Sequence, residues 1–295
     1  MENFNEWIKV IEHSSFNKVY NYLLIDKKNL LFDISFNQVA RLVKDFPPDF
    51  LVISHFHLDH QTGKVRLKRK YNTKIIAHEL EVDSIERRDG FSENYNKYNG
   101  KELVKRLHFI YWGFKSSKVE IKVKDDQVIN IGDHELKVIH TPGTTPGHIC
   151  LFEVNEKILL AGDIGPLELP IYNAITSSVI QYMKSYDKLI NLKPKIILSA
   201  HFAPLIGENK IVKAYKKAEL RFVNRERKIL ELINEKNLTL EEIAMKSPTI
   251  KNKPSESIMK KWLIFAEKIQ VMHHLEKLKL ENKIKSNNKT QWSII

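Results

Sequence analysis

Residues 54–60 place four metal-capable side chains within six positions, directly after an apolar run that predicts a short buried strand. These side chains are His55, His57, Asp59 and His60. Imidazole nitrogens and carboxylate oxygens are the ligands that zinc prefers in proteins. In an extended chain the first three side chains share one side, whereas His60 departs from the alternation as the loop turns into a helix. The cluster can therefore serve two neighbouring metals.

Three later polar side chains also lie beside predicted strands. His148 ends the turn-rich loop 140–148, in which glycine and proline fix the backbone. Asp163 follows a strand that begins at Lys157, and His201 follows a strand that begins at Lys195. Each candidate ligand therefore lies where a predicted strand meets a loop.

Short apolar strands separated by polar turns fill the first two-thirds of the chain, and helices fall between some of them. This order predicts an α/β fold in which helices cover sheets. The predicted strands are 19–25, 30–34, 51–53, 74–77, 128–131, 136–139, 149–154, 157–160 and 195–198. The predicted helices are 37–44, 64–71, 79–88 and 177–192. The aromatic-rich stretch 89–118 predicts a helical excursion whose rings either pack in the core or line a substrate pocket.

The sequence changes character at residue 208, where a long helical pattern begins that continues to residue 235. Thr239 and Glu242 then match a capping box, which predicts a helix over residues 240–246. A second long helix is expected over residues 255–281, followed by a terminal hairpin. Helix, helix and hairpin together give a winged-helix-like outline.

The composition is that of a globular protein, with 42% hydrophobic and 28% charged residues over 295 positions. Lys and Arg outnumber Asp and Glu by 48 to 36, a net charge of +12. Residues 216–295 contribute +8 of this charge, from 18 basic and 10 acidic side chains. The basic tail either binds an anionic partner such as nucleic acid or carries interleaved charges on solvated helix faces.

The single cysteine, Cys150, excludes an intrachain disulfide and a four-cysteine zinc site. It lies in a predicted apolar strand, where we expect it to pack rather than to catalyse. The N-terminus lacks the basic start and apolar stretch of a signal peptide, and no apolar run approaches the ~20 residues of a spanning helix. We therefore expect a cytoplasmic protein that makes no membrane contact.

The ordered candidate ligands resemble those of the metallo-β-lactamase superfamily, whose signature is a His-x-His-x-Asp-His motif followed by three dispersed ligands. The resemblance covers residues 19–207 and implies the αββα sandwich of that superfamily. The C-terminal end is similar to the branch that includes the β-lactamase-like protein 2 endoribonucleases. This likeness divides the chain into a catalytic domain, residues 1–207, and a small helical winged-helix-like domain, residues 208–295.

The resemblance implies two metal ions, expected to be Zn²⁺ with iron or manganese as the alternatives. The implied ligands of the first metal are His55, His57 and His148. Those of the second metal are Asp59, His60 and His201, and Asp163 would bridge the two. Asp59 would also orient the attacking hydroxide and so act as the catalytic carboxylate. His140 and the pair His273 and His274 are expected to have structural roles.

Two metals that share a water lower its pKa towards ~7, which yields hydroxide at neutral pH. The expected function is therefore hydrolysis of a small ester, thioester or lactone by a metal-bound hydroxide. The main alternative is endonucleolytic cleavage of single-stranded RNA. Two minor alternatives are a mono-iron sulfur dioxygenase and a non-catalytic metal-binding module. The fold hosts several of these chemistries, so the ligand set alone does not choose among them.

The basic tail bears on this choice. If it binds RNA, cationic side chains should contact phosphates. The candidates are Arg221, Arg225, Lys251, Lys253, Lys260 and Lys261. Otherwise the tail packs on the catalytic domain or forms a homodimer interface through Trp262, Phe265 and Ile269, which recur at helical spacing.

Overall fold

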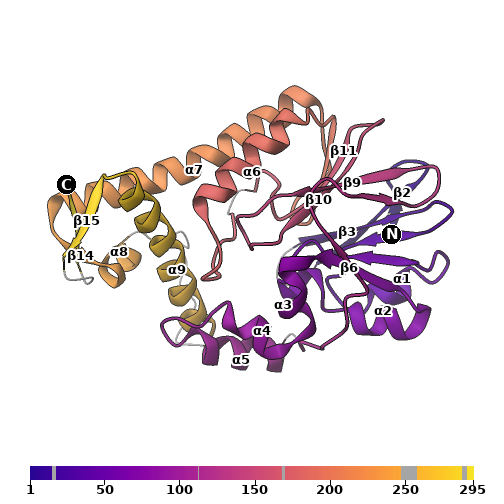
Figure 1. Cartoon of the computed structure of the whole chain (residues 1–295), viewed down its shortest axis with the longest axis horizontal. Coiled ribbons are helices and arrows are strands. Elements are labelled where there is room, and N and C mark those ends of the chain that lie inside the picture. The colour runs from indigo at the N-terminus through magenta and orange to yellow at the C-terminus, as the bar shows by residue number, and fades with distance from the viewer. Residues whose placement is uncertain (15–17, 112, 168–169, 247–257, 288–290) are drawn as a thin grey trace.

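The computed structural model describes residues 1–14, 18–111, 113–167, 170–246, 258–287 and 291–295. Two β-sheets lie face to face and helices cover their outer faces, which confirms the expected αββα sandwich (Figure 1). A smaller C-terminal unit lies at the opposite end of the molecule from the N-terminus. Two long helices, α7 Glu208–Glu235 and α9 Ile258–Leu280, join this unit to the sandwich.

The N-terminal sheet contains seven strands in chain order among the described residues. They are β1 Glu2–Asn3, β2 Ile8–Ser14, β3 Lys18–Leu24, β4 Leu30–Phe32, β5 Phe50–Val52, β6 Lys74–His78 and β7 Ile121–Val123. Strands β1 to β4 are antiparallel, and β4 to β7 run parallel. Because parallel strands share a direction, the loops after β4, β5 and β6 leave the sheet at the same edge.

The second sheet has the strand order β13-β12-β11-β10-β9-β8 over the described part of the chain. Its strands are β8 Val128–Asn130, β9 Glu135–His140, β10 Ile149–Glu153, β11 Ile158–Gly162, β12 Ile196–Ser199 and β13 Leu205–Ile206. Only β11 and β12 pair in parallel among these strands. The loops that carry Asp163 and His201 therefore also leave at one edge.

Apolar side chains from both sheets fill the space between them, including Leu24, Val52, Leu151 and Leu160. A second core lies between the first sheet and the N-terminal helices, and a third lies between the second sheet and helices α6 and α7. The helices of the sandwich are α1 Val39–Leu42, α2 Lys64–Tyr71, α3 Val82–Glu86, α4 Arg88–Glu93, α5 Gly100–Tyr111 and α6 Val179–Asn191, with short 3₁₀ turns η1 Leu58–His60 and η2 Glu79–Glu81.

The C-terminal unit is built from helices α7 Glu208–Glu235, α8 Leu240–Lys246 and α9 Ile258–Leu280 and a small sheet. That sheet has the order β14-β16-β15, with β14 Leu238–Thr239, β15 Ile284–Asn287 and β16 Gln291–Ile294. Thr239 and Glu242 exchange hydrogen bonds at the start of α8, which confirms the capping box. The predicted hairpin tip at 288–290 and the segment 247–257, with Lys251 and Lys253, lie outside the described residues.

The boundary at residue 207 stays a prediction, because α7, which begins directly after it at Glu208, packs on both parts of the chain. Its first half contributes Ile211, Tyr215 and Phe222 to the core under the second sheet, and its second half contributes Ile229 and Ile233 to a core of the C-terminal unit. Among the described helices, none combines the length and the apolar character that crossing a bilayer requires.

Candidate metal centre

The candidate ligands converge at the edge where the two sheets release their loops. Strand β5 ends at Val52, and the next residues carry His55 and His57 into the turn η1, which contains Asp59 and His60. From the second sheet, Gly162 ends β11 with a φ of +49° and delivers Asp163. A side chain at Gly162 would place its Cβ 2.7 Å from His148 Nε2, so only glycine fits this turn.

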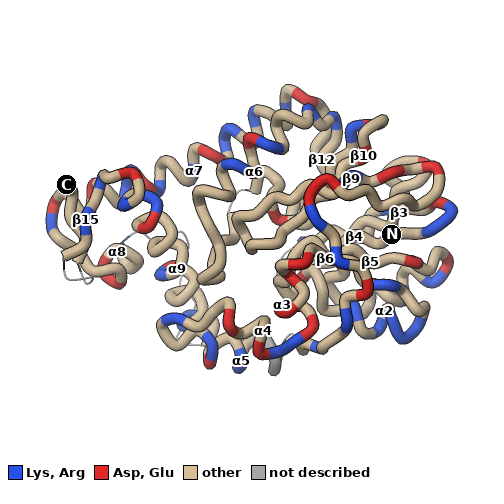
Figure 2. Tube along the Cα trace, in the orientation of Figure 1, with Lys and Arg blue, Asp and Glu red and all other residues tan. Residues whose placement is uncertain are grey.

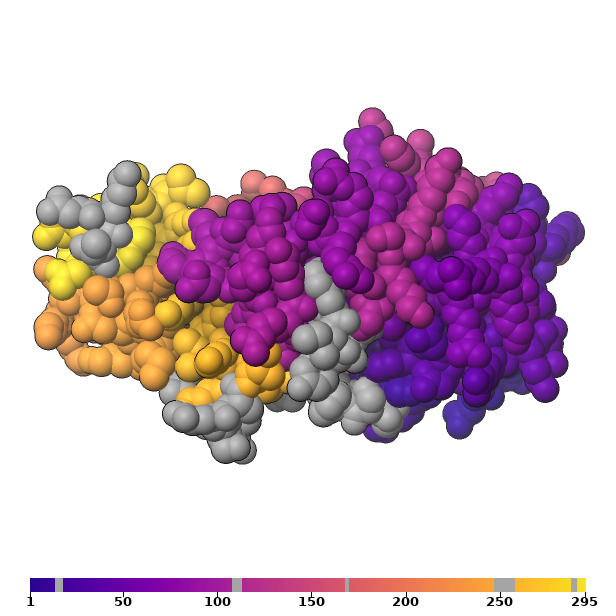
Figure 3. Space-filling model, turned by 90° about the horizontal axis from the view of Figure 1, so that it is seen from below, coloured from indigo at the N-terminus to yellow at the C-terminus, as the bar shows by residue number. Residues whose placement is uncertain are grey.

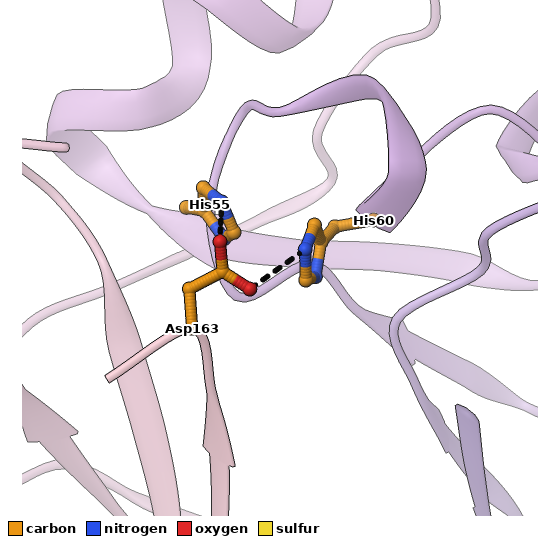
Figure 4. A group of neighbouring side chains, drawn as sticks. All are labelled: His55, His60 and Asp163. Carbon is orange, nitrogen blue, oxygen red and sulfur yellow. Dashed lines mark ion pairs between the residues drawn. The ribbon is translucent and has the colours of Figure 1, made fainter. Parts of the chain in front are cut away.

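Asp163 lies between two groups of histidines (Figure 4). Its Oδ1 is 3.0 Å from both His60 Nε2 and His201 Nε2. Its Oδ2 is 3.5 Å from His55 Nε2 and 3.9 Å from His57 Nδ1. One carboxylate oxygen therefore faces the proposed second-metal ligands and the other faces two proposed first-metal ligands, as a bridging carboxylate requires.

Asp59 joins the second group. Its Oδ2 lies 3.5 Å from His201 Nε2 and 3.7 Å from His60 Nε2. Its side chain keeps 33% of its surface exposed, whereas that of Asp163 is almost fully buried. Asp59 is therefore the carboxylate of the centre that solvent or a substrate can reach.

His148 lies beside the first group but faces a different partner. Its ring centroid is 5.1 Å from that of His55. Its Nε2 accepts a hydrogen bond from the Asp163 backbone N–H at 3.1 Å, and Thr141 Oγ1 contacts its Nδ1 at 2.9 Å. The structure thus brings His148 to the centre without presenting a free ring nitrogen to the other ligands.

Asp33, to which the sequence analysis assigns no role, supports the second group. It follows β4 with a φ of 60°, and its Oδ2 accepts a hydrogen bond from His60 Nδ1 at 2.8 Å. The same carboxylate accepts hydrogen bonds from the Ser54 backbone N–H and Oγ. A carboxylate on the outer nitrogen fixes the orientation of a metal-binding imidazole and makes it more basic. An acidic residue near the end of the predicted apolar strand 30–34 is the one sequence signal for this role.

Burial and neighbouring charges shift the pKa values of several groups in the centre. Burial lowers the pKa of His55 and His148 well below the ordinary range. Burial opposes protonation of His60 too, but the carboxylates of Asp163, Asp59 and Asp33 outweigh it and raise the pKa of His60. For Asp163, the neighbouring histidines overcome the effect of burial and hold its pKa well below the usual value.

Five buried nitrogen and oxygen atoms of the centre lack a hydrogen-bond partner among the described residues. They are His57 Nε2, His60 Nε2, His201 Nε2, and Asp163 Oδ1 and Oδ2. Leaving a buried polar atom unsatisfied costs about 1–3 kcal/mol, so a folded protein rarely tolerates five together. All five are nitrogen or oxygen atoms of the kinds that bind a divalent cation. Two groups of three residues have ligand atoms within 4.8 Å of one another: one is His55, His60 and Asp163, and the other is Asp59, His60 and His201. The residues present therefore fit bound metal.

His140, His273 and His274 have structural contacts, as expected. His140 Nε2 donates to the Pro146 carbonyl at 2.8 Å, and its ring stacks on that of His78. His273 contacts the Ala174 carbonyl, and His274 bonds Glu226 on α7. The Cys150 side chain is buried in β10, which agrees with a packing role.

A sandwich of two mixed sheets between helices, with histidines and carboxylates gathered at one edge, is the architecture of a metal-dependent hydrolase. The family model of the metallo-beta-lactamase superfamily matches residues 18–201. The chain belongs to this superfamily.

Three relatives illustrate its similarities. The chain is 30% identical over 242 residues to a Beta-lactamase-like protein 2 homolog of Drosophila melanogaster, covering 80% of this chain and 70% of the relative. It is 32% identical over 170 residues to an Acyl-coenzyme A thioesterase MBLAC2 of Homo sapiens, covering 52% and 56% of the two chains. It is 25% identical over 182 residues to a Hydroxyacylglutathione hydrolase of Pelagibacter ubique, covering 59% and 61%. The chain thus spans little more than half the length of the human thioesterase.

A solved structure extends the likeness to the C-terminal unit. The crystal structure of a metallo-beta-lactamase family protein from Thermus thermophilus has a TM-score of 0.73 and 17% sequence identity. The match covers 99% of this chain and all of that one. The fold of the whole chain, including its C-terminal helices, is therefore shared with a known protein.

Proposed function

We propose that this protein is a dinuclear, most simply zinc-dependent, hydrolase of a small thioester, with esters and lactones as related substrates. The observation that carries the proposal is the Asp163 carboxylate, whose two unpartnered oxygens face two separate histidine groups. The thioester class is favoured because two relatives are named for acyl-coenzyme A and hydroxyacylglutathione hydrolysis, and both of those substrates are thioesters.

The first metal would be held by His55, His57 and His148, the second by Asp59, His60 and His201, and Asp163 would bind both. Two cations bound there would lower the pKa of a water between them towards ~7 and so supply a nucleophile without a serine or cysteine. For His148 to join this set, its Nε2 must release the Asp163 backbone N–H that it now accepts.

The protein prepares the rings for this role by holding their outer nitrogens. Ser54 Oγ contacts His55 Nδ1 at 2.9 Å, and Asp33 and Thr141 contact the Nδ1 atoms of His60 and His148. In each ring the Nε2 atom is thereby left on the inner side, and the ring cannot turn freely. The partly exposed carboxylate of Asp59 would orient the attacking water and accept its proton.

An apolar wall adjoins the proposed first-metal position. The centroid of the Phe56 ring lies 5.1 Å from that of the His57 ring and 5.7 Å from that of the Phe91 ring. Tyr95, from the aromatic-rich stretch, packs between Phe56 and Trp262 of α9. The Phe56, Phe91 and Tyr95 side chains are each at most 1% exposed and belong to one hydrophobic core, so they support the loop that carries His57.

The test is one metal-loaded preparation assayed in parallel against an acyl-coenzyme A, an S-acylglutathione, a lactone, a phosphodiester and single-stranded RNA. The same protein stripped by chelator and then reloaded with zinc, manganese or iron is the control. We expect metal-dependent turnover of at least one thioester. RNA cleavage without thioester turnover would overturn the substrate class, and metal content below one ion per chain would overturn the dinuclear site.

Cleavage of single-stranded RNA remains the second candidate because of the basic tail. Basic and acidic residues interleave along α7 and the C-terminal unit (Figure 2). Arg225 is paired with Glu267, and Arg221 donates to the Leu167 carbonyl, so these two arginines serve the fold. Lys260 and Lys261 instead line a groove of about 790 Å³ between α5 and α9, together with Arg106. RNA held there should show a log–log salt dependence of roughly −0.7 per phosphate contact.

A further inference from the structure

Glu81 is a fully buried carboxylate that the proposed mechanism does not use. It ends the turn η2 that follows β6, at the same edge as the metal centre. Its side chain accepts three hydrogen bonds, all from neutral donors: the Phe56 N–H at 2.8 Å, Thr145 Oγ1 at 2.8 Å and the Gly147 N–H at 2.7 Å. Burial raises the pKa of Glu81 to about 7, although these three donors act to lower it.

The three donors flank the proposed first-metal ligands. Phe56 stands between His55 and His57 in the chain, and Gly147 directly precedes His148. The Oε2 atom serves the first of these loops, and the Oε1 atom serves the second. One side chain therefore connects two ligand loops that come from different sheets.

The second loop is fitted closely to this carboxylate. A Cβ atom at Gly147 would lie 2.8 Å from Glu81 Cγ and 2.9 Å from Glu81 Oε1, so no larger residue can occupy this position without displacing Glu81. His140, at the start of the same loop, stacks on His78 at 4.3 Å between ring centroids. The loop thus docks on the segment 78–81 along its length.

The backbone carbonyl of Phe56 is held by a hydrogen bond as well. Its carbonyl accepts a hydrogen bond from Gln61 Nε2, and Gln61 Oε1 accepts one from Lys64. With its N–H on Glu81, the peptide between His55 and His57 has both polar groups bound by buried side chains. Movement of Glu81 would therefore shift the spacing of these two histidines from His148.

We propose that Glu81 is a positioning residue that sets the affinity of the first metal position by holding the His55–His57 loop and the His148 loop at a fixed separation. The second position has its own support, because Asp33 bonds His60 directly and reaches the first-metal ligand His55 only through Ser54 Oγ. This inference rests on the proposed metal sites. Its consequence is selective: loss of Glu81 should weaken one metal and spare the other.

The test compares Glu81→Gln with Glu79→Gln, an exposed carboxylate in the same turn that pairs with Lys124. The amide keeps the shape of Glu81 but turns an N–H towards the backbone N–H of either Phe56 or Gly147, and a backbone N–H cannot accept a hydrogen bond. Metal affinities are measured by competition with a chromogenic chelator, on protein whose fold is checked by circular dichroism. For Glu81→Gln we expect one of two metals to bind about 10–100-fold more weakly and the other unchanged.

Thr145→Val provides a milder second variant, because it removes one donor to Glu81 and keeps the side-chain shape. It should weaken the same metal position by a smaller factor, and Glu79→Gln should match wild type. Unchanged affinity for both metals in Glu81→Gln, or an equal loss of both, would overturn the positioning role. Wild-type protein that binds two metals upholds the proposed site in either case, so failure of the two ideas can be told apart.

Discussion

At the scale of single residues, Asp163 is the side chain on which both proposed ligand sets depend. Its two oxygens face different histidine groups, and neither oxygen has a hydrogen-bond partner among the described residues. A negative charge between two cations reduces their mutual repulsion, which a neutral amide of the same shape cannot do. The charge of Asp163, more than its shape, should therefore decide whether both metals stay bound.

We predict that Asp163→Asn lowers the metal content from about two ions per chain to one or fewer, and thioester turnover by at least about 100-fold. Elemental analysis and kcat/KM measured on the same preparation check this. Asp133→Asn, at an exposed ion pair with Lys27, is the matched control and should behave as wild type. An Asp163→Asn variant with two metals and full turnover would show that the bridging assignment is wrong.

Lys64 offers a residue-scale test of the fold through pH. Its side chain is buried in α2, donates to Gln61 Oε1 at 2.5 Å and lies 4.7 Å from the centroid of the Phe114 ring. Burial lowers its pKa from 10.5 to about 7. Between these values the folded chain has released a proton that the unfolded chain still holds, so stability rises with pH across the window. Below pH 7 Lys64 is protonated in both the folded and the unfolded chain, so the full free-energy cost of burying its charge lowers the stability.

Lys64→Met removes the titrating amine and with it the cost of burying a positive charge. The free energy of unfolding of wild type should therefore rise relative to that of Lys64→Met by about 1.4 kcal/mol per pH unit between pH 7.5 and 9.5. Urea unfolding at a fixed zinc concentration measures the difference. Lys70→Met, on an exposed position of the same helix, should show a difference that does not vary with pH. A pH-independent difference for Lys64→Met as well would mean that Lys64 stays charged in the folded protein.

At the scale of elements, patterns that repeat along the chain are predicted well. Helices α2, α7 and α8 have the bounds expected from their apolar spacing, 64–71, 208–235 and 240–246. Strands β1, β2, β7, β13 and β14 are absent from the prediction. Strand β2 is recognisable only through its pairing with β3, where Ile8 lies opposite Leu24, and β7 is a three-residue strand defined by its register with β6. Pairings between strands cannot be predicted from the local sequence of either strand.

In the metal centre too, the sequence predicts some residues and not others. Its candidate ligands could be named from the sequence because they share a compact motif and lie at strand ends. The roles of Asp33 and Glu81 could not, because Asp33 reaches His60 across 27 positions and Glu81 reaches Gly147 across 66. A buried acceptor is recognised by the donors around it, and these come from distant parts of the chain.

A buried ion pair connects the two long helices. Arg225 of α7 pairs with Glu267 of α9, and their side chains are 10% and 8% exposed. Arg225 also donates to Gln270 on α9 and to the Tyr172 hydroxyl, which in turn contacts His274. Removing one partner of a buried pair leaves the other charge without compensation, and this costs more than the pair itself contributes.

We predict that Arg225→Met destabilises the protein by about 3–5 kcal/mol and that Arg225→Met with Glu267→Met recovers most of the loss. Urea unfolding of wild type, Arg225→Met, Glu267→Met and the double variant forms a double-mutant cycle. Lys216→Met, at an exposed ion pair on the same helix, should cost less than about 1 kcal/mol. A double variant as unstable as the single one would place the stabilisation in packing rather than in charge.

At the scale of the whole molecule, α9 ties the C-terminal unit to the core beneath the N-terminal sheet. Phe265 and Ile269 of α9 are buried in the same core as Phe56 and Tyr95, so these residues pack within the chain, one of the two arrangements left open by the sequence. Figure 3 shows the region of α5 lying against α9. His273 and His274 also hold the loop after Asp163, through the Ala174 carbonyl and the Tyr172 hydroxyl.

Deletion of residues 236–295 should therefore abolish hydrolysis of every substrate, thioester or RNA. The deletion uncovers the apolar surface that Phe265 and Ile269 cover, at a cost of about 1.5–3 kcal/mol for each large side chain, and it releases the loop that follows Asp163. Deletion of residues 283–295 is the control, because it removes β15 and β16 but leaves α9 in place. We expect it to lower the unfolding midpoint while thioester turnover at 20 °C persists. A chain ending at residue 235 that stays monomeric, binds two metals and turns over thioester would show that α9 is dispensable for the catalytic core.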